Sequence, residues 1–539
     1  MAERTGAEAI VNIIKEAGVR TVFGIPSIHN IALYDVLRSE PAIRHILCRQ
    51  EASATHMADG YARQKNHLGV VIASTGPGTC YTTPGILEAW CSCSPVLLIT
   101  TNIPLNKIGR GQGALHELND QASLFRNMTK AVFEVRSSAD IEPMTREATR
   151  TALSGCPGPV CLEVPTDLLR GPVPKGLEKA VEPAPASALP PGMEDALSRL
   201  RKAKQPLIIA GQGAVRAGIS AEILSIAESL GAPVITATNG KGLIPEDHPL
   251  AFGFAGRRGV VREVVGACDM VLAIGTRLRE ADAKRRGLVL NDLIHVDWDE
   301  RWIGKNYPAA VALVGDVVAI AQHMAGELAG ETPSEARRSW VADARKTLAA
   351  ELEDVRKDRK EMAYLEAIRN AIPGDGVLVA DNTQLAYWAE YFYNSQCPGG
   401  LAAARGSAVI GYALAAAVGA KLADPKRAIV ALIGDGGFLY GAQELATAVR
   451  HGIGFPVVVV NDNAFGIIAH LQRSYYGNEH ESRLINPDFV ALAHSFNVNG
   501  LRVDTPPMLE AAIQRALGSQ GMWVIELEAD FPEPPFGLY

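Results

Sequence analysis

Two acidic turn motifs in the last third of the chain have the residue types of a metal site. Gly434-Asp435-Gly436-Gly437 follows the largely apolar run 427–433, and Asn461-Asp462-Asn463 follows the apolar run 455–460. Two parallel neighbouring strands would bring Asp435 and Asp462 to the same carboxyl edge of a sheet, where open α/β sheets bind ligands. Hard oxygen ligands at such an edge suit Mg²⁺ that carries a phosphorylated cofactor. The alternative is that both motifs are ordinary β-turns, because their residues are common in turns.

The elements that position these motifs follow an alternation of helical and strand patterns, which predicts an α/β fold. We expect three doubly wound parallel-sheet domains, over residues 1–175, 190–330 and 355–539. A linker rich in Pro and Ala, 171–192, separates the first two domains. The charged run 327–360 predicts a solvated helix that joins the last two. The first and third domains have similar patterns.

Composition limits the partners. The chain has 539 residues, of which 47% are hydrophobic and 21% charged, so it is too long for a single core. A net charge of −7 gives no reason to expect binding to nucleic acid or to a membrane surface. No apolar stretch reaches the roughly 18 residues of a membrane span. We expect small molecules and other copies of the chain as partners.

The N-terminus and the cysteines indicate the compartment. Early acidic residues and an amphipathic pattern at the N-terminus predict no signal peptide. The eight cysteines include no CxxC pair and most lie in apolar surroundings, which favours buried thiols over a metal or disulfide framework. We therefore expect a cytoplasmic protein.

The second domain opens with a turn that resembles a dinucleotide loop. Gly211-Gln212-Gly213 follows the apolar run 206–210. The third glycine of the motif is misplaced, and no acidic residue follows at the distance that ribose binding requires. We therefore do not expect this domain to bind a dinucleotide.

Motifs along nearly the whole chain resemble the thiamine-diphosphate-dependent enzymes of the pyruvate decarboxylase and acetolactate synthase superfamily. They lie at residues 22–26, 51–63, 74–78, 155–165 and 434–463. Within the superfamily, segments 108–121 and 239–245 look most like the decarboxylases of 5-guanidino-2-oxopentanoate. The resemblance implies a pyrimidine-binding first domain, a central domain, and a third domain that binds the diphosphate and Mg²⁺.

The resemblance assigns Glu51 to the aminopyrimidine ring of the cofactor. An acid there favours the imino tautomer, whose nitrogen removes the thiazolium C2 proton. A carboxyl group in an apolar pocket has its neutral form favoured, which suits proton transfer near neutral pH. The alternative is that Glu51 caps the helix expected to start at Ala52. Many relatives have His where this chain has Gln50, so a relay through that His is absent here.

The metal ligands implied by the resemblance are Asp435, Asp462 and the carbonyl oxygen of Ala464. Relatives often have Asn where this chain has Asp462, so two anionic ligands would lie beside the diphosphate. Such extra negative charge weakens cofactor binding unless the metal neutralises it. The alternative ligand is Asn463, one residue out of register.

Other third-domain residues are implied to hold the cofactor itself. Gly436 and Gly437 would let backbone amides approach the phosphates. Ile410 would hold the cofactor bent, and the carbonyl of Ala408 would accept a hydrogen bond from the aminopyrimidine, although both residues could instead be helix core. Further cofactor contacts are expected from Pro26, Glu51, Gly76, Thr383, Gln384, Gly434, Phe465 and Gly466.

Substrate contacts are expected from polar residues in loops that resemble the family's pocket lining, and each could equally be a surface or core residue. They are Ser27, His29, Gln112, His116 and His470. Where the guanidino-acid decarboxylases carry acidic residues, this chain has a basic run, 277–286. That run argues against a guanidinium substrate.

Together these features predict a thiamine-diphosphate- and Mg²⁺-dependent enzyme that decarboxylates a small 2-oxo acid through an enamine intermediate. One alternative is an acetolactate-synthase-like carboligase, and another is a cofactor-binding homologue without turnover, against which the retained Glu51 argues. FAD is not expected. Family geometry puts Glu51 of one subunit against the Asp435 site of another, which implies a homodimer or homotetramer.

Overall fold

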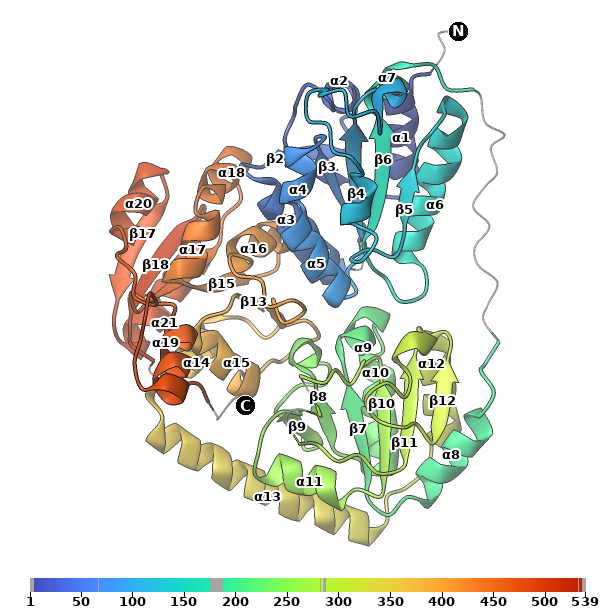
Figure 1. Ribbon diagram of the computed structural model, residues 1–539. Helices are drawn as coiled ribbons and strands as arrows, with labels where there is room; N and C mark the ends of the chain where they lie inside the picture. The colour runs from blue at the N-terminus through green and yellow to red at the C-terminus, as the bar shows by residue number, and fades with distance from the viewer. Residues whose placement is uncertain are drawn as a thin grey trace.

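The chain folds around three six-stranded sheets, in which every strand pair is parallel (Figure 1). The computed structural model describes residues 4–65, 67–174, 188–281, 283–284, 287–531 and 533–535. Helices cover both faces of each sheet, so the prediction of three doubly wound domains is confirmed. The domain boundaries given above stay predictions, and most of the expected linker, 175–187, lies outside the described residues.

The first sheet has the order β2-β1-β3-β4-β6-β5. Its strands are β1 (Thr21–Gly24), β2 (Arg44–Leu47), β3 (Gly69–Ala73), β4 (Val96–Asn102), β5 (Val132–Glu134) and β6 (Val160–Pro165). Its helices are α1 (Gly6–Glu16), α2 (Ile31–Arg38), α3 (Glu51–Lys65), α4 (Pro77–Tyr81), α5 (Thr83–Cys91), α6 (Ile141–Leu153) and α7 (Thr166–Arg170). The strands β3, β4 and β6 are buried along their whole length, as expected of a parallel sheet covered on both faces.

The third sheet repeats this topology in the order β14-β13-β15-β16-β18-β17. Its strands are β13 (Val377–Ala380), β14 (Leu401–Ala403), β15 (Ile429–Gly434), β16 (Pro456–Asn461), β17 (Asn499–Val503) and β18 (Trp523–Glu528). Its helices are α14 (Lys360–Ala371), α15 (Gln384–Phe392), α16 (Ala413–Ala423), α17 (Asp435–Gly441), α18 (Glu444–His451), α19 (Gly466–Tyr476), α20 (Phe489–Ser495) and α21 (Pro506–Leu517).

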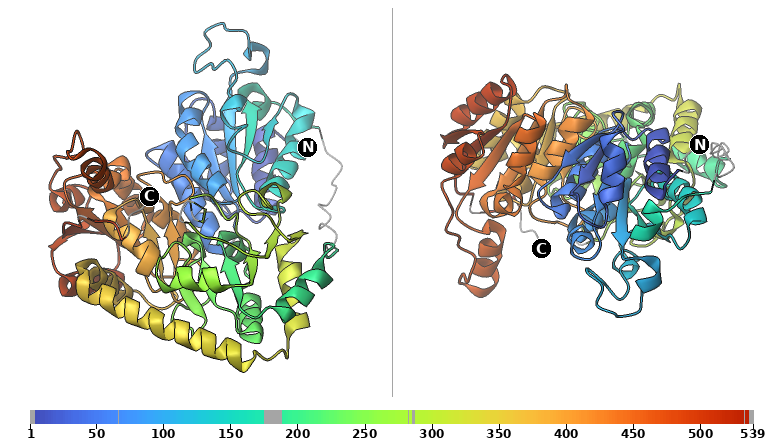
Figure 2. Two further views of the ribbon diagram at one scale, coloured as in Figure 1. Left: turned by 60° about the horizontal axis from the view of Figure 1, so that its bottom comes forward. Right: turned by 90° about the horizontal axis from the view of Figure 1, so that it is seen from above.

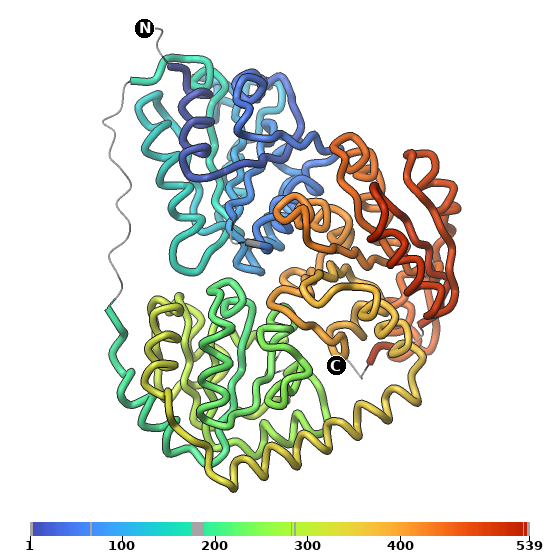
Figure 3. The backbone as a smooth tube through the Cα atoms, turned by 180° about the vertical axis from the view of Figure 1, so that it is seen from behind, coloured from blue at the N-terminus to red at the C-terminus, as the bar shows by residue number. Residues whose placement is uncertain are grey.

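The central sheet has a different order, β12-β11-β10-β7-β8-β9, so the chain reverses its winding direction between β7 and β10. Its strands are β7 (Pro206–Ala210), β8 (Val234–Thr236), β9 (Ala251–Phe254), β10 (Met270–Ile274), β11 (Leu293–Asp297) and β12 (Val311–Val314). Its helices are α8 (Met193–Lys202), α9 (Gln212–Ala217), α10 (Ser220–Leu230), α11 (Val260–Ala267) and α12 (Val317–Leu328). A separate helix, α13 (Glu335–Asp358), runs along the outside from the central to the third domain (Figure 3).

The first and third domains dock through α3 and α16. A Cβ atom on Gly60 of α3 would overlap the backbone of Ala416, and one on Gly419 of α16 would overlap the carbonyl of Met57. These glycines therefore let two helix backbones approach more closely than larger residues would. Beside them, Tyr412 Oη donates to Asp59 Oδ2 at 2.8 Å in a buried setting. The contact fixes the start of α3, which carries Glu51, relative to the third domain.

Two segments extend from one side of the molecule. The light-blue segment between β4 and β5 projects away from the domains, and the orange α19 region projects in the same direction (Figure 2). Across the described ranges, every helix is too short or too polar to cross a membrane.

Candidate active site

The third sheet brings the two acidic turns together. β15 and β16 are hydrogen-bonded neighbours, with Gly434 beside Val460 at their carboxyl ends. Asp435 begins α17 directly after β15, and Asp462 follows β16 directly. The two side chains therefore lie at one edge of the sheet, as the strand patterns predict.

Asp435 is held by three donors. Its Oδ1 accepts from the Gly436 amide at 2.7 Å, and its Oδ2 accepts from the Ala464 amide at 3.2 Å and from Asn486 Nδ2 at 2.7 Å. Burial raises the pKa of Asp435, and these donors oppose the rise. The carboxylate is therefore fixed in place by groups that favour its charged form.

Asp462 lies in a less favourable electrostatic setting. Burial, and then the negative charge of Asp435, raise the pKa of Asp462 to about 7. A divalent cation next to both carboxylates would remove this repulsion. In the described part of the chain, no group of three or more His, Cys, Asp or Glu side chains is placed so that it could hold a metal ion. A cation would thus have two carboxylates from the chain, which fits Mg²⁺, since that ion commonly takes its other ligands from phosphate and water.

A pocket with about 750 Å³ of open space adjoins these carboxylates. Every third-domain residue that the resemblance assigns to the cofactor lines it, so we call it the cofactor pocket. These residues are Thr383, Gln384, Ala408, Ile410, Gly434, Asp435, Gly436, Gly437, Asp462, Ala464, Phe465 and Gly466. A Cβ atom on Gly436 would lie 2.7 Å from the Phe465 ring, so this position leaves room for backbone only. The N-terminus of α17 thus faces the pocket with two glycines, and beyond the Gly436 amide, which Asp435 engages, no side chain of its own covers the backbone at Gly437, which suits an anionic ligand.

Asp381 shapes another wall of the pocket. This fully buried carboxylate accepts from the Asn382 amide at 2.7 Å, the Gly411 amide at 3.3 Å and the Ala413 amide at 3.0 Å. It therefore caps the first turn of α16 and fixes the preceding loop, which carries Ala408 and Ile410. Ala408 has a left-handed backbone, with φ of 58°, and its carbonyl accepts from Asn382 Nδ2 at 2.9 Å. Ile410 is half-buried beside Gly437 and is not part of the α16 core.

Glu51 belongs to a separate group of residues in the first domain. It is the first residue of α3, so it is not the capping residue that precedes the helix. Its carboxyl lies beside the start of α4 and the turn that precedes it, because a Cβ atom on Gly78, the second residue of α4, would be 3.1 Å from Glu51 Oε1. Burial raises the pKa of Glu51. The preceding Gln50 accepts a hydrogen bond from Gln443 of the third domain at 3.2 Å.

Three of the five predicted substrate residues adjoin this turn. Ser27 Oγ donates to Ser74 Oγ at 2.7 Å, and the backbone of His116 contacts Gly76 closely. The rings of His29 and His116 are 5.0 Å apart, and burial together with His116 lowers the pKa of His29.

The other predicted residues lie apart from this group. Gln112 is exposed in the projecting segment between β4 and β5, and Pro26 is exposed beside Ser27. His470 lies on α19, with Nε2 3.4 Å from Ser474 Oγ, and is not among the residues that line the cofactor pocket. Asn463, the alternative metal ligand, is exposed and its Oδ1 accepts from Asn486 at 3.2 Å.

Glu51, Pro26 and Gly76 do not line the cofactor pocket of their own chain. One chain therefore carries two half-sites, one around Glu51 and one around Asp435. Within one chain, α3 packs against α16, through Gly60 and Gly419, and Glu51 at its start is not among the residues that line the Asp435 pocket.

Sequence reasoning misses several supporting residues. Asn486 donates to Asp435 from a loop far along the chain, and no local motif marks it. Gln121 accepts from the Gly76 amide at 2.8 Å and donates to Glu163 Oε2 at 2.9 Å, so it fixes the turn beside Glu51. Tyr387 lines the cofactor pocket from α15, and no local motif marks it.

Comparison with known proteins identifies the family to which the chain belongs. Models of the thiamine pyrophosphate enzymes match residues 4–124 as the N-terminal TPP binding domain, 193–324 as the central domain and 381–527 as the C-terminal TPP binding domain. The chain is 36% identical to the probable 2-ketoarginine decarboxylase AruI of Pseudomonas aeruginosa, over 97% of this chain and 94% of that protein. The chain belongs to the thiamine pyrophosphate enzymes.

Acetolactate synthases are also similar to this thiamine pyrophosphate enzyme. The chain is 31% identical to the probable acetolactate synthase large subunit of Methanocaldococcus jannaschii, over 99% of this chain and 94% of that protein. It is 28% identical to the acetolactate synthase large subunit of Haemophilus influenzae, over 99% of this chain and 96% of that protein. The predicted superfamily and the predicted dependence on thiamine diphosphate are confirmed.

Proposed function

We propose that this enzyme decarboxylates a small 2-oxo acid with thiamine diphosphate and Mg²⁺. The observation that carries the proposal is the pocket at the third-sheet edge, which combines two acidic side chains with the uncovered N-terminus of α17. Asp435 and Asp462 would hold Mg²⁺ together with the Ala464 carbonyl. Gly436 and Gly437 would let the diphosphate approach the backbone, and the Gly437 amide would bind it, because the Gly436 amide donates to Asp435 Oδ1.

Glu51 would act on the aminopyrimidine end of the cofactor. Bound thiamine diphosphate supplies an electron sink for the electron pair that CO₂ leaves behind. Because burial raises the pKa of Glu51, its carboxyl group holds a proton more readily than an exposed acid does, and can share that proton with a ring nitrogen. Ile410, which faces the same pocket, would fix the bend that brings the two ends of the cofactor together.

The complete site would form between two subunits. Glu51 does not reach the Asp435 pocket within one chain, so a second copy would have to supply it. Both half-sites have exposed apolar side chains nearby, including Ile28 (59% exposed) and Leu115 (60%) in the first domain and Tyr440 (57%) and Ile468 (48%) in the third. Burying them against a partner is favourable, which supports a homodimer or a homotetramer built from dimers.

The basic run that argues against a guanidinium substrate lies away from the cofactor pocket. Arg277 contacts Cys93 at the boundary between the central and first domains, and it does not line the pocket around Asp435. Asp282, Arg285 and Arg286 of the same run lie outside the described residues. The relative from Pseudomonas aeruginosa is named for 2-ketoarginine, so this acid belongs in a substrate test, and the argument from the basic run against a guanidinium substrate stays a prediction.

A second candidate is a carboligase, because the relatives at 31% and 28% identity are named acetolactate synthases. Decarboxylation is common to both candidates. After CO₂ leaves, the remaining carbon takes up a proton in a decarboxylase, whereas in a carboligase it forms a bond to a second carbonyl compound.

One experiment tests the proposal and separates the two candidates. The purified protein is given thiamine diphosphate, Mg²⁺ and a panel of 2-oxo acids that includes 2-ketoarginine and pyruvate, each alone and with an aldehyde. We expect CO₂ release from at least one acid, with an aldehyde as product for a decarboxylase or a hydroxyketone for a carboligase. Absence of CO₂ from every acid, in protein shown calorimetrically to bind the cofactor, would contradict the proposal.

A further inference from the structure

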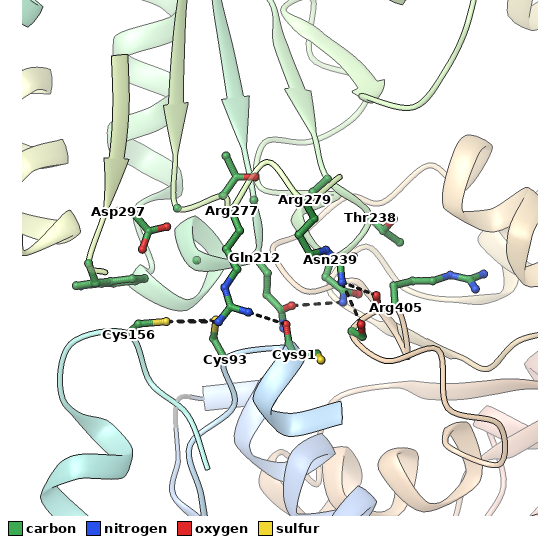
Figure 4. Close-up of a pocket in the computed structure, with 17 residues that line it drawn as sticks. Cys91, Cys93, Cys156, Gln212, Thr238, Asn239, Arg277, Arg279, Asp297 and Arg405 are labelled. Atoms are coloured by element: carbon green, nitrogen blue, oxygen red, sulfur yellow. Dashed lines mark hydrogen bonds between the residues drawn. The ribbon is translucent and has the colours of Figure 1, made fainter. Parts of the chain in front are cut away.

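A second pocket lies where the three domains meet, away from the cofactor pocket (Figure 4). The first domain contributes Cys93 and Cys156, the central domain Arg277 and Asp297, and the third domain Arg405. Figure 4 shows the Arg277 side chain extending from the central domain to the two cysteines. None of these residues has a part in the proposed decarboxylation.

The two thiols are close although they come from different loops. Cys93 follows α5, and Cys156 lies between α6 and β6. The Cys156 thiol donates to Cys93 Sγ across 3.3 Å. A disulfide bond is about 2.05 Å long, so the two sulfurs need to approach by only a little over 1 Å. Because both loops belong to one domain, this approach requires no movement between domains.

The surroundings favour a thiolate at Cys93. Arg277 Nη2 donates to Cys93 Sγ at 2.7 Å, and the guanidinium also stacks on Trp302 at 4.3 Å from the ring centroid. The hydrogen bond from Cys156 and the charge of Arg277 lower the pKa of Cys93 to about 7, against the effects of burial and of Asp297. The hydrogen bond to Cys93, followed by burial, raises the pKa of Cys156. Near neutral pH, Cys93 is therefore a thiolate in about half of the molecules, while Cys156 keeps its proton.

Small oxidants can reach the pair. Cys93 and Cys156 are only half-buried, in contrast to Cys48, Cys161 and Cys268, which are fully buried. The pocket that they line has a cavity volume of about 60 Å³, which is room for a molecule of the size of hydrogen peroxide. Low pKa, partial exposure and a neighbouring second thiol are the features that make a cysteine pair sensitive to oxidation.

We propose that Cys93 and Cys156 form a redox-active pair that hydroperoxides convert reversibly into a disulfide. The Cys93 thiolate attacks one peroxide oxygen; an S–O bond forms, the O–O bond breaks, and Cys93 becomes a sulfenic acid, while the other peroxide oxygen leaves as an alkoxide, or as hydroxide from hydrogen peroxide, and takes a proton from water. The Cys156 sulfur then attacks Cys93 Sγ, an S–S bond forms, and the hydroxide that leaves takes the Cys156 proton as water. The peroxide gains two electrons, and the two thiols lose them.

Oxidation would change the contact between the first and central domains. In the reduced state Arg277 bridges them through an ionic hydrogen bond to the Cys93 sulfur. A disulfide sulfur carries no negative charge and is a weak acceptor, so Arg277 would lose its main partner in the first domain. The helix that precedes Cys93, α5, carries Glu88, which accepts from the amides of Gly406 and Ser407 beside the cofactor pocket. Through α5 and Glu88, the cysteine pair is therefore connected to the loop that carries Ala408.

Peptide mapping tests the disulfide directly. The reduced full-length protein is treated with a small excess of hydrogen peroxide, its remaining thiols are blocked, and its proteolytic peptides are analysed by mass spectrometry. We expect a peptide pair joined through Cys93 and Cys156 that dithiothreitol separates. If the Cys93 thiol is consumed while Cys156 stays free, or if neither reacts under doses that oxidise free cysteine, the proposal is wrong.

Matched variants separate the roles of the sulfurs. In Cys156→Ser, peroxide should leave Cys93 as a sulfenic acid that dimedone traps. Cys91→Ser is the control, because Cys91 lines the same pocket but burial raises its pKa, and this variant should form the disulfide as readily as the wild type. Loss of the disulfide in Cys91→Ser, or absence of dimedone labelling in Cys156→Ser, would overturn the assignment.

The pH dependence of alkylation gives an independent readout that does not require oxidation. The rate at which iodoacetamide labels Cys93 should reach half of its maximum near pH 7. In Arg277→Met the midpoint should move upward, because the thiolate loses its cationic partner. A midpoint near that of an ordinary cysteine, about 8.5, in the wild-type protein would contradict the thiolate assignment.

Discussion

Asp435 and Asp462 differ in how the structure supports their charges, although both lie at the edge of the third sheet. Asp435 accepts three hydrogen bonds, whereas Asp462 has its pKa raised to about 7 by burial and by its neighbour. The first carboxylate is therefore preorganised as an anion, and the second depends more on a bound cation. This asymmetry gives the two residues different sensitivities to substitution.

We predict that Asp435→Asn weakens Mg²⁺-dependent binding of thiamine diphosphate at least tenfold. The amide has only one acceptor oxygen, so at least one donor loses its partner, at a cost of about 1–3 kcal/mol. Asp462→Asn should change the affinity by less than tenfold, because it also removes the repulsion from Asp435. Calorimetric titration at saturating Mg²⁺ measures both, and a larger loss for Asp462→Asn would contradict this ranking.

Glu51→Gln should lower kcat by roughly 100-fold or more while leaving the affinity for thiamine diphosphate largely unchanged. The amide keeps the size of the side chain and, like the protonated acid, has one carbonyl acceptor and a donor, but it cannot exchange a proton as an acid, and general acid–base catalysis contributes about 10²–10⁴-fold. Steady-state kinetics and calorimetry on the same preparation distinguish the two effects. Unchanged turnover would remove Glu51 from the mechanism.

The same substitution should change the pH dependence of stability. Burial raises the pKa of Glu51 above its ordinary value of 4.5, so the folded protein holds this proton more tightly than the unfolded chain does. The stability from this group is complete below pH 4.5 and is lost as the pH rises through the folded pKa. We therefore compare the Tm of Glu51→Gln with that of the wild type, both without cofactor. The Tm of the variant minus that of the wild type should be larger at about pH 8 than at about pH 5. If the Tm of Glu51→Gln minus the Tm of the wild type falls as the pH rises, this sign is wrong.

At the scale of elements, α5 connects the first domain to the wall of the cofactor pocket. Glu88 is fully buried and accepts from Arg63 Nη2 at 2.9 Å, from the Gly406 amide at 3.2 Å and from the Ser407 amide at 2.7 Å. Its carboxylate thus fixes the start of the loop that continues to Ala408 and Ile410. The shape of the cofactor pocket therefore depends on a helix of another domain.

Glu88→Gln should destabilise the protein by about 3 kcal/mol, because breaking a buried ion pair leaves Arg63 less well compensated. It should also weaken cofactor binding, since the loop of Ala408 loses an anchor. Denaturant unfolding and calorimetry measure the two effects. The control is Glu353→Gln, whose carboxylate is about half exposed on α13 and whose loss should cost no more than about 0.5 kcal/mol. Equal effects from both variants would contradict the role of Glu88.

At the scale of the whole molecule, the separation of the two half-sites predicts complementation between inactive variants. Chains carrying Glu51→Gln and chains carrying Asp435→Ala should each be inactive alone. In a mixed dimer, one of the two sites would receive Glu51 from one chain and Asp435 from the other, so random pairing should restore about a quarter of wild-type activity.

Co-expression of the two variants, followed by purification and assay, measures this recovery. A site formed within one chain would give no recovery, because every chain lacks one of the two residues. Sedimentation analysis of the wild-type protein provides the companion measurement, and an active monomer would contradict the shared site.

The sequence by itself determined the fold class and one wall of the active site. Parallel-sheet strands appear as short apolar runs, and turn residues at their carboxyl ends must meet at one edge, so Asp435 and Asp462 could be paired from spacing alone. The resemblance to the thiamine-diphosphate-dependent enzymes then placed residues such as Gly436 and Ile410, which line the same pocket. Local patterns were sufficient for Asp435 and Asp462 because both residues follow their strands directly.

Only the tertiary structure decided which distant residues meet. Asn486 reaches Asp435, Gln121 fixes the turn beside Glu51, and Arg277 lies against Cys93, yet none of these pairs has a sequence spacing that predicts contact. Such contacts depend on how sheets and domains dock, which local periodicity does not encode. The docking of α3 on α16 also separates Glu51 from the Asp435 pocket of the same chain, and this packing is the physical reason to expect a second subunit.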